Sequence, residues 1–488
     1  MKTIAPLSDF GFKVANTSDE AFDVFNYLNT NRFEKDTNPN GVVNIGVAIN
    51  KLLQKTVVDK LNAAKEFDFE SLEYGSPRGS DAFRNEIASL VNRHFNVHTP
   101  ITDDDIVVTN GCTAAINVIS WIICNPGDAV LVSAPLYGAF LSDVTHRTGA
   151  TLEHVQVPVS ELQSTSQIAL FEQKFAELSS KGIVPKMLII CNPHNPTGKI
   201  YPRKVLESFY QFAESHNMYV LVDEIYALSV YRAPHLNDTP EPAFVCSDST
   251  SSESTSDLEQ LVEFESALSW PNLSDFINPQ RVVVVHGMSK DFCMNGLRVG
   301  WIISPWNKDI KEAAFRTSNF QYISSHTDSV LTNFLSDHEF IDNFISQVCN
   351  RLKESYIKIS DYFKKNGIGY YPAQAGHFIW ADFSPLLLKY TNKKLIAASK
   401  SENGNVNGTS NGTENQNNVT LLTSTSQLSV DDCKSMWRDA VYKAGVCYTA
   451  GANFLADRPG WVRVIFAIPW DELELGLDRL IKFSSPDQ

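Results

Sequence analysis

The chain has 488 residues, of which 43% are hydrophobic and 20% are charged. This composition is close to that of ordinary globular proteins and excludes global disorder, and the length leaves room for two or three packed units. The 56 acidic residues outnumber the 41 basic residues, which gives a formal net charge of −15. Such a chain offers no extended positive surface to a polyanion, so we predict that nucleic acid is not a partner.

The first residues, MKTIAPLSDFGFK, lack the apolar run of a secretory signal. No apolar stretch in the sequence approaches the roughly 20 residues that are needed to cross a bilayer. We therefore expect a cytoplasmic protein without a membrane span. The 8 cysteines are scattered, without the short paired spacings of zinc sites or disulfide frameworks, so they predict reduced core thiols and no metal site.

Five short apolar runs, rich in β-branched residues, follow one another between residues 105 and 290. They are DIVVTN, AVLVSAP, MLIICNP, MYVLVDE and RVVVVHGMSK. Their apolar residues are continuous rather than alternating, which is typical of parallel strands that are covered on both faces. Helical stretches such as VLESFYQFAESHN separate them, with apolar residues at every third or fourth position. The pattern predicts an α/β fold with a mostly parallel, doubly wound sheet.

Two segments differ in composition from the rest of the chain. The segment over about 234–280 is rich in Ser, Asp and Pro and has little periodicity, so we predict an inserted excursion on the surface. The segment over about 391–427 includes KSENGNVNGTSNGTENQNN, which buries too little apolar surface to offset chain entropy, so we predict disorder there. We expect neither segment to carry chemistry.

Polar side chains follow three of the predicted strands, namely Asn195, Asp223 with Tyr226, and Lys290. In open α/β sheets, ligands bind beyond the carboxyl ends of the strands. No GxGxxG or P-loop motif accompanies these strands, which disfavours a nucleotide ligand. An amine, a carboxylate, an amide and a phenol suit a pyridine-aldehyde cofactor. The amine forms a Schiff base, the carboxylate keeps the ring nitrogen protonated, and the amide and phenol hold the ring hydroxyl.

Such a cofactor also carries a phosphate, and the sequence offers a place for it. The run GCTAAINVISWII follows DIVVTN, so Gly111, Cys112 and Thr113 begin a predicted helix directly after a strand. The free N–H groups and the positive dipole end of a helix start favour an anion. Arg298, which follows Lys290 in the sequence, could add a bidentate charge to the same phosphate.

Five motifs occur together in this chain: YGSPRG, NPHNPTGKIY, VDEIYA, SKDFCMNGLRVGW and PGWVRVIFA. With them the chain resembles the class I/II aminotransferases of fold type I, which use pyridoxal 5'-phosphate, and most of all the 1-aminocyclopropane-1-carboxylate (ACC) synthase-like branch. The resemblance covers nearly the whole chain apart from the two polar segments. It implies an N-terminal arm and part of the small domain over 1–65, a large cofactor-binding domain over 66–325, and a smaller α+β domain over 326–488. The segments 234–280 and 391–427 would be insertions in the second and third of these.

The resemblance also implies a role for each of the residues at the predicted cofactor ring. Lys290 would hold pyridoxal phosphate as a Schiff base and would then move the α-proton of the substrate. Asp223 would pair with the ring nitrogen, whereas Tyr226 and Asn195 would bind the ring oxygen. Tyr137, in APLYGAF, would stack on the ring.

Further residues have implied roles at the phosphate and the substrate. Cys112, Thr113 and Arg298 would hold the phosphate, and Arg463 would bind the α-carboxylate of the substrate. Tyr74 would reach the phosphate of the cofactor in the neighbouring subunit. That last role implies a homodimer with shared active sites.

Three positions depart from the family pattern. Gly287 stands where a serine commonly contacts the phosphate, and His377 stands where an apolar residue is usual. Ile49, in GVAINKL, stands in a substrate-binding position where ACC synthases have a glutamate. An apolar side chain cannot replace that carboxylate, so we expect negligible ACC formation and amino-group transfer from a neutral, apolar or aromatic amino acid.

We predict a pyridoxal-phosphate-dependent aminotransferase that moves an amino group from an L-amino acid to a 2-oxo acid. An alternative is an ACC synthase-like or carbon–sulfur lyase that acts on a sulfur-containing amino acid. A remote alternative is the sensor domain of a transcription regulator, although the first 70 residues contain no basic winged-helix module.

Overall fold

The computed structural model of the chain describes residues 7–8, 11–12, 15–16, 20–63, 67, 69–236, 238–242, 244–245, 261–403 and 420–485. The expectations for residues 246–260 and 404–419 lie outside this part of the chain. None of the described helices is both long enough and apolar enough to cross a lipid bilayer.

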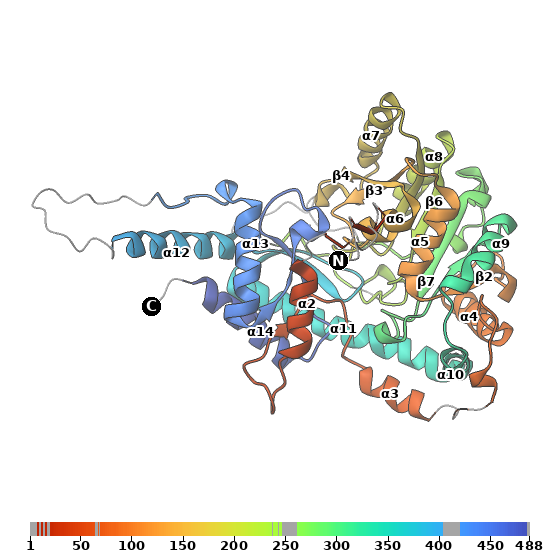
Figure 1. Cartoon of the computed structure of the whole chain (residues 1–488), viewed down its shortest axis with the longest axis horizontal. Coiled ribbons are helices and arrows are strands. Elements are labelled where there is room, and N and C mark those ends of the chain that lie inside the picture. The colour runs from red at the N-terminus through yellow and green to blue at the C-terminus, as the bar shows by residue number, and fades with distance from the viewer. Residues whose placement is uncertain are drawn as a thin grey trace, which may run out of the picture.

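A seven-stranded sheet forms the centre of the larger part of the molecule (Figure 1). Its strands are β2 (Ile106–Thr109), β3 (Ala129–Ala134), β4 (Thr151–Gln156), β5 (Pro185–Cys191), β6 (Tyr219–Asp223), β7 (Val282–Gly287) and β8 (Gly300–Ile303). They lie in the order β2-β8-β7-β6-β5-β3-β4. The central pairs are parallel, and β8 runs antiparallel to both β2 and β7. The predicted α/β class with a mostly parallel sheet is confirmed.

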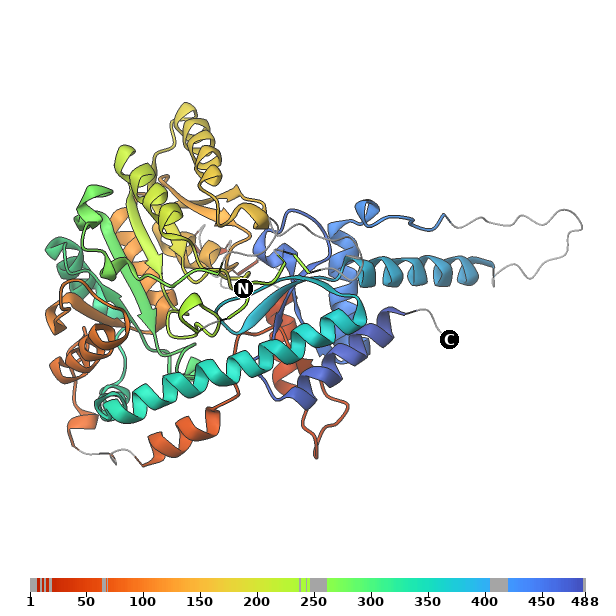
Figure 2. The same ribbon diagram turned by 180° about the vertical axis from the view of Figure 1, so that it is seen from behind.

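Helices cover both faces of this sheet (Figures 1 and 2). Successive residues of β7 show why the strand is apolar throughout: Val282 and Val284 join one hydrophobic cluster, and Val283 and Val285 join another on the opposite face. The helices of this part are α4 (Asp81–His94), α5 (Gly111–Ile123), α6 (Phe140–Thr148), α7 (Ile168–Ser180), α8 (Arg203–Ser215), α9 (Lys308–Thr317) and α10 (Ser325–Ser336). The predicted helix before β6 corresponds to α8.

The smaller part contains a four-stranded antiparallel sheet and a short parallel pair. Its strands are β1 (Val43–Asn44), β9 (Gly369–Tyr371), β10 (Phe378–Asp382), β11 (Val446–Cys447), β12 (Thr449–Ala450) and β13 (Trp461–Ile465). Its helices are α2 (Glu20–Thr30), α11 (His338–Asn366), α12 (Ser384–Asn403), α13 (Val430–Asp439) and α14 (Trp470–Ser484). The helix α3 (Gln54–Asn62) lies beside α10 of the larger part (Figure 1). Figure 2 shows α11 running along the molecule from the larger part to the smaller part.

The amino-terminal segment packs with the carboxyl-terminal part of the chain. Val24 and Leu28 of α2 form a small hydrophobic cluster with Val441 and Cys447. β1 pairs with β11, and Val43 lies opposite Val446 in this parallel register. This pairing positions residues 46–50, which continue from β1 toward the carboxyl ends of the central strands.

The segment 234–280 does not stay on the surface at its carboxyl end, which corrects the sequence-based expectation. Trp270, Leu273 and Ile277 are buried in the main core. The buried carboxylate of Glu224 accepts hydrogen bonds from Ser266 Oγ at 2.7 Å and from the Ala267 amide at 2.8 Å. A few widely spaced apolar residues thus anchor a segment whose average composition is polar.

Residues 391–403 also differ from the expectation of disorder for 391–427, because α12 continues to Asn403. Lys, Leu and Ala in KKLIAASK are strong helix formers, which favours this extension. Asn392 exchanges two hydrogen bonds with the backbone of Leu422, at 2.9 and 2.8 Å. Figure 1 shows α12 extending away from the rest of the molecule.

Candidate active site

A cavity of about 300 Å³ lies at the carboxyl ends of β5, β6 and β7. Asp223 is the last residue of β6, and Lys290 and Asn195 follow β7 and β5 within a few residues. Because adjacent parallel strands end at the same sheet edge, these side chains converge. The cavity is lined by nine of the predicted site residues: Cys112, Thr113, Tyr137, Asn195, Asp223, Tyr226, Lys290, Arg298 and Arg463.

Lys290 and Asp223 contribute an amine and a carboxyl group to the cavity wall. Burial lowers the pKa of Lys290 to about 8, and the positive charge of Arg463 acts in the same direction. Burial raises the pKa of Asp223 to about 7, although the Ile225 amide and Lys290 oppose this shift. The Nζ atom of Lys290 donates a hydrogen bond to the Ala48 carbonyl at 2.8 Å. Both groups therefore titrate near neutral pH, which is typical of catalytic side chains.

Arg463 is a buried guanidinium that faces the cavity from β13. Its Nη1 donates to Asn195 Oδ1 at 3.0 Å, and its Nη2 donates to the Gly46 carbonyl at 2.9 Å. The rings of Phe378 and Phe454 lie 5.2 and 4.8 Å from its central carbon. Both acceptors are neutral oxygen atoms, and Nε has no partner among the residues that the structure describes. The site is therefore suited to an incoming carboxylate, which a guanidinium binds in a bidentate manner.

Two tyrosines complete the apolar side of the cavity. Tyr226 is 2% exposed, and burial raises its pKa well above the usual value. Burial also raises the pKa of Tyr137 to about 12, and the nearby charge of Asp143 adds to this shift. Tyr137 packs edge-on against Phe140, with ring centroids 5.2 Å apart. Both phenols therefore stay protonated at neutral pH and can donate hydrogen bonds.

The start of α5 forms a cradle beside Arg298. Gly111 has φ of +82°, and a methyl group there would come within 2.6 Å of Arg298 Nη2. The residue that precedes the helix, Asn110, does not cap it with its side chain. The first N–H groups of α5 are thus available to an anion that also meets Arg298. Cys112 and Thr113 lie in this first turn and line the cavity.

Close packing explains why position 287 is a glycine. A methyl group on Gly287 would come within 2.7 Å of Gly300 Cα and of the Val299 carbonyl oxygen. Gly300 is equally close to α5, because a methyl group there would approach the Cys112 amide within 2.6 Å. β7, β8 and the start of α5 therefore pack backbone against backbone, and serine does not fit at position 287 without a shift of the main chain.

The sequence reasoning missed Asp143, a buried carboxyl group of α6 that lines the same cavity. Burial raises its pKa to about 7, and the charge of Asp223 acts in the same direction. Phe140 and Val144 are buried on the same side of α6. An acidic residue at helical spacing between two core residues was the signal that could have identified it. Asn295 and Thr449 also line the cavity and were not predicted.

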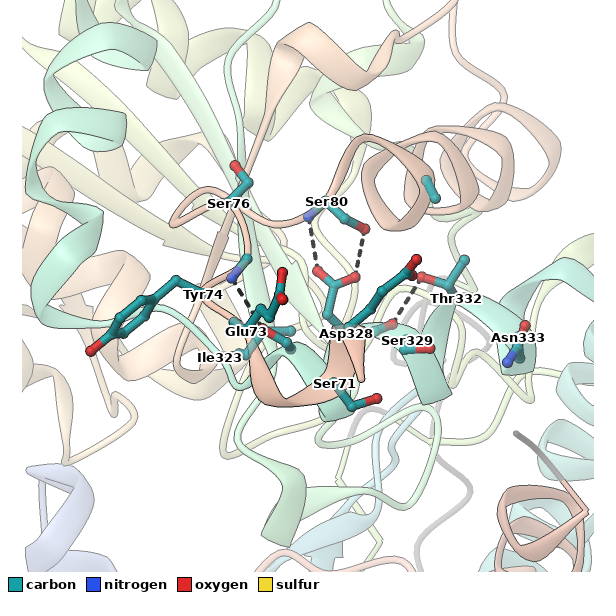
Figure 3. A pocket seen from close by; sticks show the side chains of 14 residues that line it. Ser71, Glu73, Tyr74, Ser76, Ser80, Ile323, Asp328, Ser329, Thr332 and Asn333 are labelled. Atoms are coloured by element: carbon teal, nitrogen blue, oxygen red, sulfur yellow. Dashed lines mark hydrogen bonds between the residues drawn. The ribbon is translucent and has the colours of Figure 1, made fainter. Parts of the chain in front are cut away.

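The structure does not bring Tyr74 or Ile49 into this cavity. Tyr74 is 95% exposed and lines a different cavity of about 480 Å³. Figure 3 shows its ring pointing away from the other labelled side chains. Ile49 lines a third cavity of about 250 Å³, which shares only Val47 with the first. Within one chain, Ile49 therefore makes no wall of the site that holds Lys290.

The chain belongs to the family of class I and II aminotransferases, because the model of that family matches residues 41–480. It lies near the ACC synthase branch of this pyridoxal-phosphate-dependent family. Over 92% of its length it is 25% identical to ACC synthase-like protein 1 of Takifugu rubripes, of which it spans 63%. It is 28% identical to the probable aminotransferase gliI of Aspergillus fumigatus, over 90% of this chain and 88% of that protein.

The fold is that of fold-type I enzymes. The aspartate aminotransferase of Thermotoga maritima superposes with a TM-score of 0.65 at 20% sequence identity, and the match covers 98% of this chain and 99% of that one. At this identity the likeness concerns the arrangement of the backbone. The predicted class, a large domain with a doubly wound sheet and a smaller α+β domain, is confirmed.

The first prediction tests the packing around Gly287. We expect Gly287→Ser to lower the free energy of unfolding by about 1 to 3 kcal/mol, the usual cost of overpacking. Gly296→Ser is the matched control, because a methyl group at Gly296 meets no atom within 4 Å. Urea unfolding of both variants measures the difference. Equal stability of the two variants would contradict the steric explanation.

The second prediction uses the pKa of Asp223. The folded state holds its proton up to about pH 7, whereas an unfolded aspartate loses it near pH 4, so the wild type loses stability as the pH rises through this window. Asp223→Asn removes this dependence. We expect its stability relative to wild type to increase by on the order of 2 kcal/mol from pH 5 to pH 8.

Urea unfolding of the cofactor-free protein at several pH values provides the measurement. Asp275→Asn serves as the control, because Asp275 is an exposed carboxylate that does not line the cavity. A stability difference between Asp223→Asn and wild type that does not vary with pH would show that Asp223 is not held protonated by burial.

Proposed function

We propose that this protein is a pyridoxal-phosphate-dependent aminotransferase that moves the amino group of an L-amino acid to a 2-oxo acid. The observation that carries the proposal is one cavity that combines a buried amine, a buried carboxyl and a guanidinium with neutral partners, namely Lys290, Asp223 and Arg463. Family membership adds support, since the family model that matches the chain is that of class I and II aminotransferases.

The cavity offers groups that match each part of pyridoxal phosphate. The uncapped start of α5, with Cys112 and Thr113, and the adjacent Arg298 suit the phosphate. Asp223 would face the ring nitrogen of the cofactor. The positive charge of that nitrogen, once protonated, would favour the ionised form of the Asp223 carboxyl group, which burial alone disfavours. Tyr226, Asn195 and Tyr137 would hold the ring and its oxygen. The bound cofactor would supply an electron sink when the α-C–H bond of the substrate breaks.

Lys290 would act as the proton carrier at its Nζ atom. Its lowered pKa of about 8 leaves about a tenth of the amine neutral at pH 7, far more than an ordinary lysine would have, and a base requires the neutral form. The Ala48 carbonyl accepts hydrogen bonds from both Lys290 Nζ and Asn295 Nδ2, at 2.8 and 3.2 Å. This contact directs the amine toward the segment 46–48, where a substrate held by Arg463 would lie.

Arg463 would orient the substrate through its α-carboxylate. Because Arg463 already contacts Asn195 and the Gly46 carbonyl, its guanidinium plane has a fixed direction. The surrounding Phe378 and Phe454 rings exclude water, which strengthens the interaction between opposite charges. An amino acid and a 2-oxo acid share the carboxylate that this group recognises, so one site would serve both half-reactions.

We also propose a homodimer in which each subunit completes the active site of the other. The segment before α4 contains three exposed apolar side chains, because Phe69, Leu72 and Tyr74 are 89%, 77% and 95% exposed. Phe320, between α9 and α10, is also 76% exposed. Such apolar exposure is uncommon on an isolated chain and favours a contact surface. Phe320 lines a cavity that also contains Arg298 and Thr113, so a partner that covers these residues would reach the phosphate cradle.

A panel of substrates tests the proposed reaction. With a neutral L-amino acid and 2-oxoglutarate or pyruvate, we expect the purified protein loaded with pyridoxal phosphate to form a new amino acid, and we expect Lys290→Ala to form none. Amino acid, ammonia and, from S-adenosylmethionine, ACC are measured in parallel. Release of ammonia or ACC without formation of an amino acid would contradict transfer and would favour the lyase alternative.

Subunit mixing tests the dimer. Truncation of a side chain that is 95% exposed has little effect in a monomer, but Tyr74→Ala should reduce activity strongly if Tyr74 enters the partner's site. Tyr74→Ala and Lys290→Ala subunits, unfolded together and refolded, should recover one intact site per heterodimer. Unchanged activity of Tyr74→Ala, or an absence of recovery in the mixture relative to each variant alone, would contradict shared sites.

A further inference from the structure

A chain of buried polar side chains lies behind the catalytic cavity. It consists of His377, Ser229, Asp291 and His286, which we call the buried relay, and each residue is at most 1% exposed. None of the four lines the cavity. The relay joins the segment after Lys290 to the turn that contains Tyr226 and to the start of β10, which are far apart in the sequence.

Asp291 is the centre of the buried relay. Its carboxylate accepts hydrogen bonds from the Leu228 amide at 3.0 Å and from His286 Nε2 at 3.0 Å, and also from Ser229 Oγ. Asp291 directly follows Lys290 in the chain. The Ser229 amide in turn donates to the Tyr226 carbonyl at 3.0 Å. Asp291 therefore fixes the turn of Tyr226 relative to the segment of Lys290.

The hydrogen-bond pattern shows which ring nitrogen of His377 carries the proton. Ser229 has a single hydroxyl proton, and it goes to the Asp291 carboxylate, which can only accept. The contact of 3.2 Å between His377 Nε2 and Ser229 Oγ must then use a proton on Nε2. Burial lowers the pKa of His377 to about 3, and the charges of Lys290 and Arg463 act in the same direction, so the ring is neutral. Its Nδ1 has no partner among the described residues.

His377 also contacts Tyr226 directly. The two rings meet edge to face, with centroids 5.5 Å apart and planes at 87°. Phe378 meets the same Tyr226 ring at 5.2 Å and 88°. The Gly376 amide donates to the Ser229 carbonyl at 3.0 Å, which fixes the backbone on this side as well. The phenol is therefore held by two consecutive rings, of which only His377 is also tied to the turn by a side-chain hydrogen bond.

We propose that His377 is a positioning residue, which through Ser229 and Asp291 fixes the Tyr226 hydroxyl in register with Lys290. This inference rests on the proposed function, because the place of that hydroxyl matters only if the cavity holds the cofactor ring. An apolar side chain at position 377 would keep the volume but would leave Ser229 Oγ without its second partner. The turn of Tyr226 would then keep its bonds to Asp291 and to the Gly376 amide, but it would lose the side-chain hydrogen bond that ties it to the ring at position 377.

The consequence is measurable in the bound cofactor. A hydrogen bond from Tyr226 to the ring oxygen favours the ionised oxygen, so its loss or lengthening raises the pH midpoint of the visible absorption change. The charged groups that act on Tyr226 and Lys290 are Arg463, Asp223 and Arg298, together with Lys290 itself, and Asp143 lies near Asp223. Asp291 and His286 are the two remaining members of the relay. The variants below leave each of these groups unchanged.

Spectral pH titration of the protein loaded with pyridoxal phosphate is the experiment. We expect His377→Leu to raise the midpoint by roughly half a unit to one unit, the equivalent of one ordinary hydrogen bond. Ser229→Ala, which removes the relay hydroxyl and keeps the ring contacts, should shift it in the same direction. His377→Gln is the matched control. The side-chain amide of glutamine can donate a hydrogen bond to Ser229 Oγ as the Nε2 atom of His377 does, so this variant should keep the midpoint near that of wild type.

A double-mutant cycle separates positioning from general structure. In a Tyr226→Phe background, His377→Leu should no longer move the midpoint, because the hydroxyl on which it acts is gone. Equal shifts in both backgrounds, or no shift from either His377→Leu or Ser229→Ala, would overturn the inference. If wild type binds no pyridoxal phosphate at Lys290, the proposed function falls together with it. If wild type binds and titrates but the variants do not shift, the inference alone falls.

Discussion

Lys290 and Asp223 lie at the carboxyl ends of two adjacent parallel strands, where burial works against the charge of both groups. Burial in the cavity lowers the pKa of Lys290 to about 8 and raises the pKa of Asp223 to about 7. Opposite charges and hydrogen bonds compensate this cost only in part. The surrounding features serve this pair: backbone packing of β7 and β8 brings the first turn of α5 next to β7, the Ala48 carbonyl accepts a hydrogen bond from the amine, and Arg463 supplies a further charge.

Most of the cavity could be predicted because its residues end apolar strands. Asp223 is the last residue of β6, and Asn195 and Lys290 follow β5 and β7 within a few residues, and this position alone brings them to one edge of the sheet. The strands β4 and β8 were missed for opposite reasons. β4 is an edge strand with exposed polar residues, so it has no continuous apolar run. β8 has only four residues, too few for a pattern to be recognised.

Other features depend on contacts that no local pattern contains. The buried relay joins residues that are separated by up to 148 positions, and the steric reason for Gly287 lies in Gly300 and Cys112 of other elements. Tyr74 and Ile49 were placed by resemblance, and a single chain holds them outside the cavity of Lys290. The polar segments were misjudged because average composition hides a few anchors, such as Trp270 in the core and Asn392 bonded to Leu422.

Covalent attachment of the cofactor tests the central claim most directly. The purified protein is saturated with pyridoxal phosphate, reduced with borohydride and digested, and the modified peptide is identified by mass spectrometry. The account predicts a single pyridoxyl group on Lys290, and less of it in Asp223→Asn when the cofactor is limiting. A modification mainly on another lysine, or no retained cofactor at saturation, would contradict the assignment of this cavity as the active site.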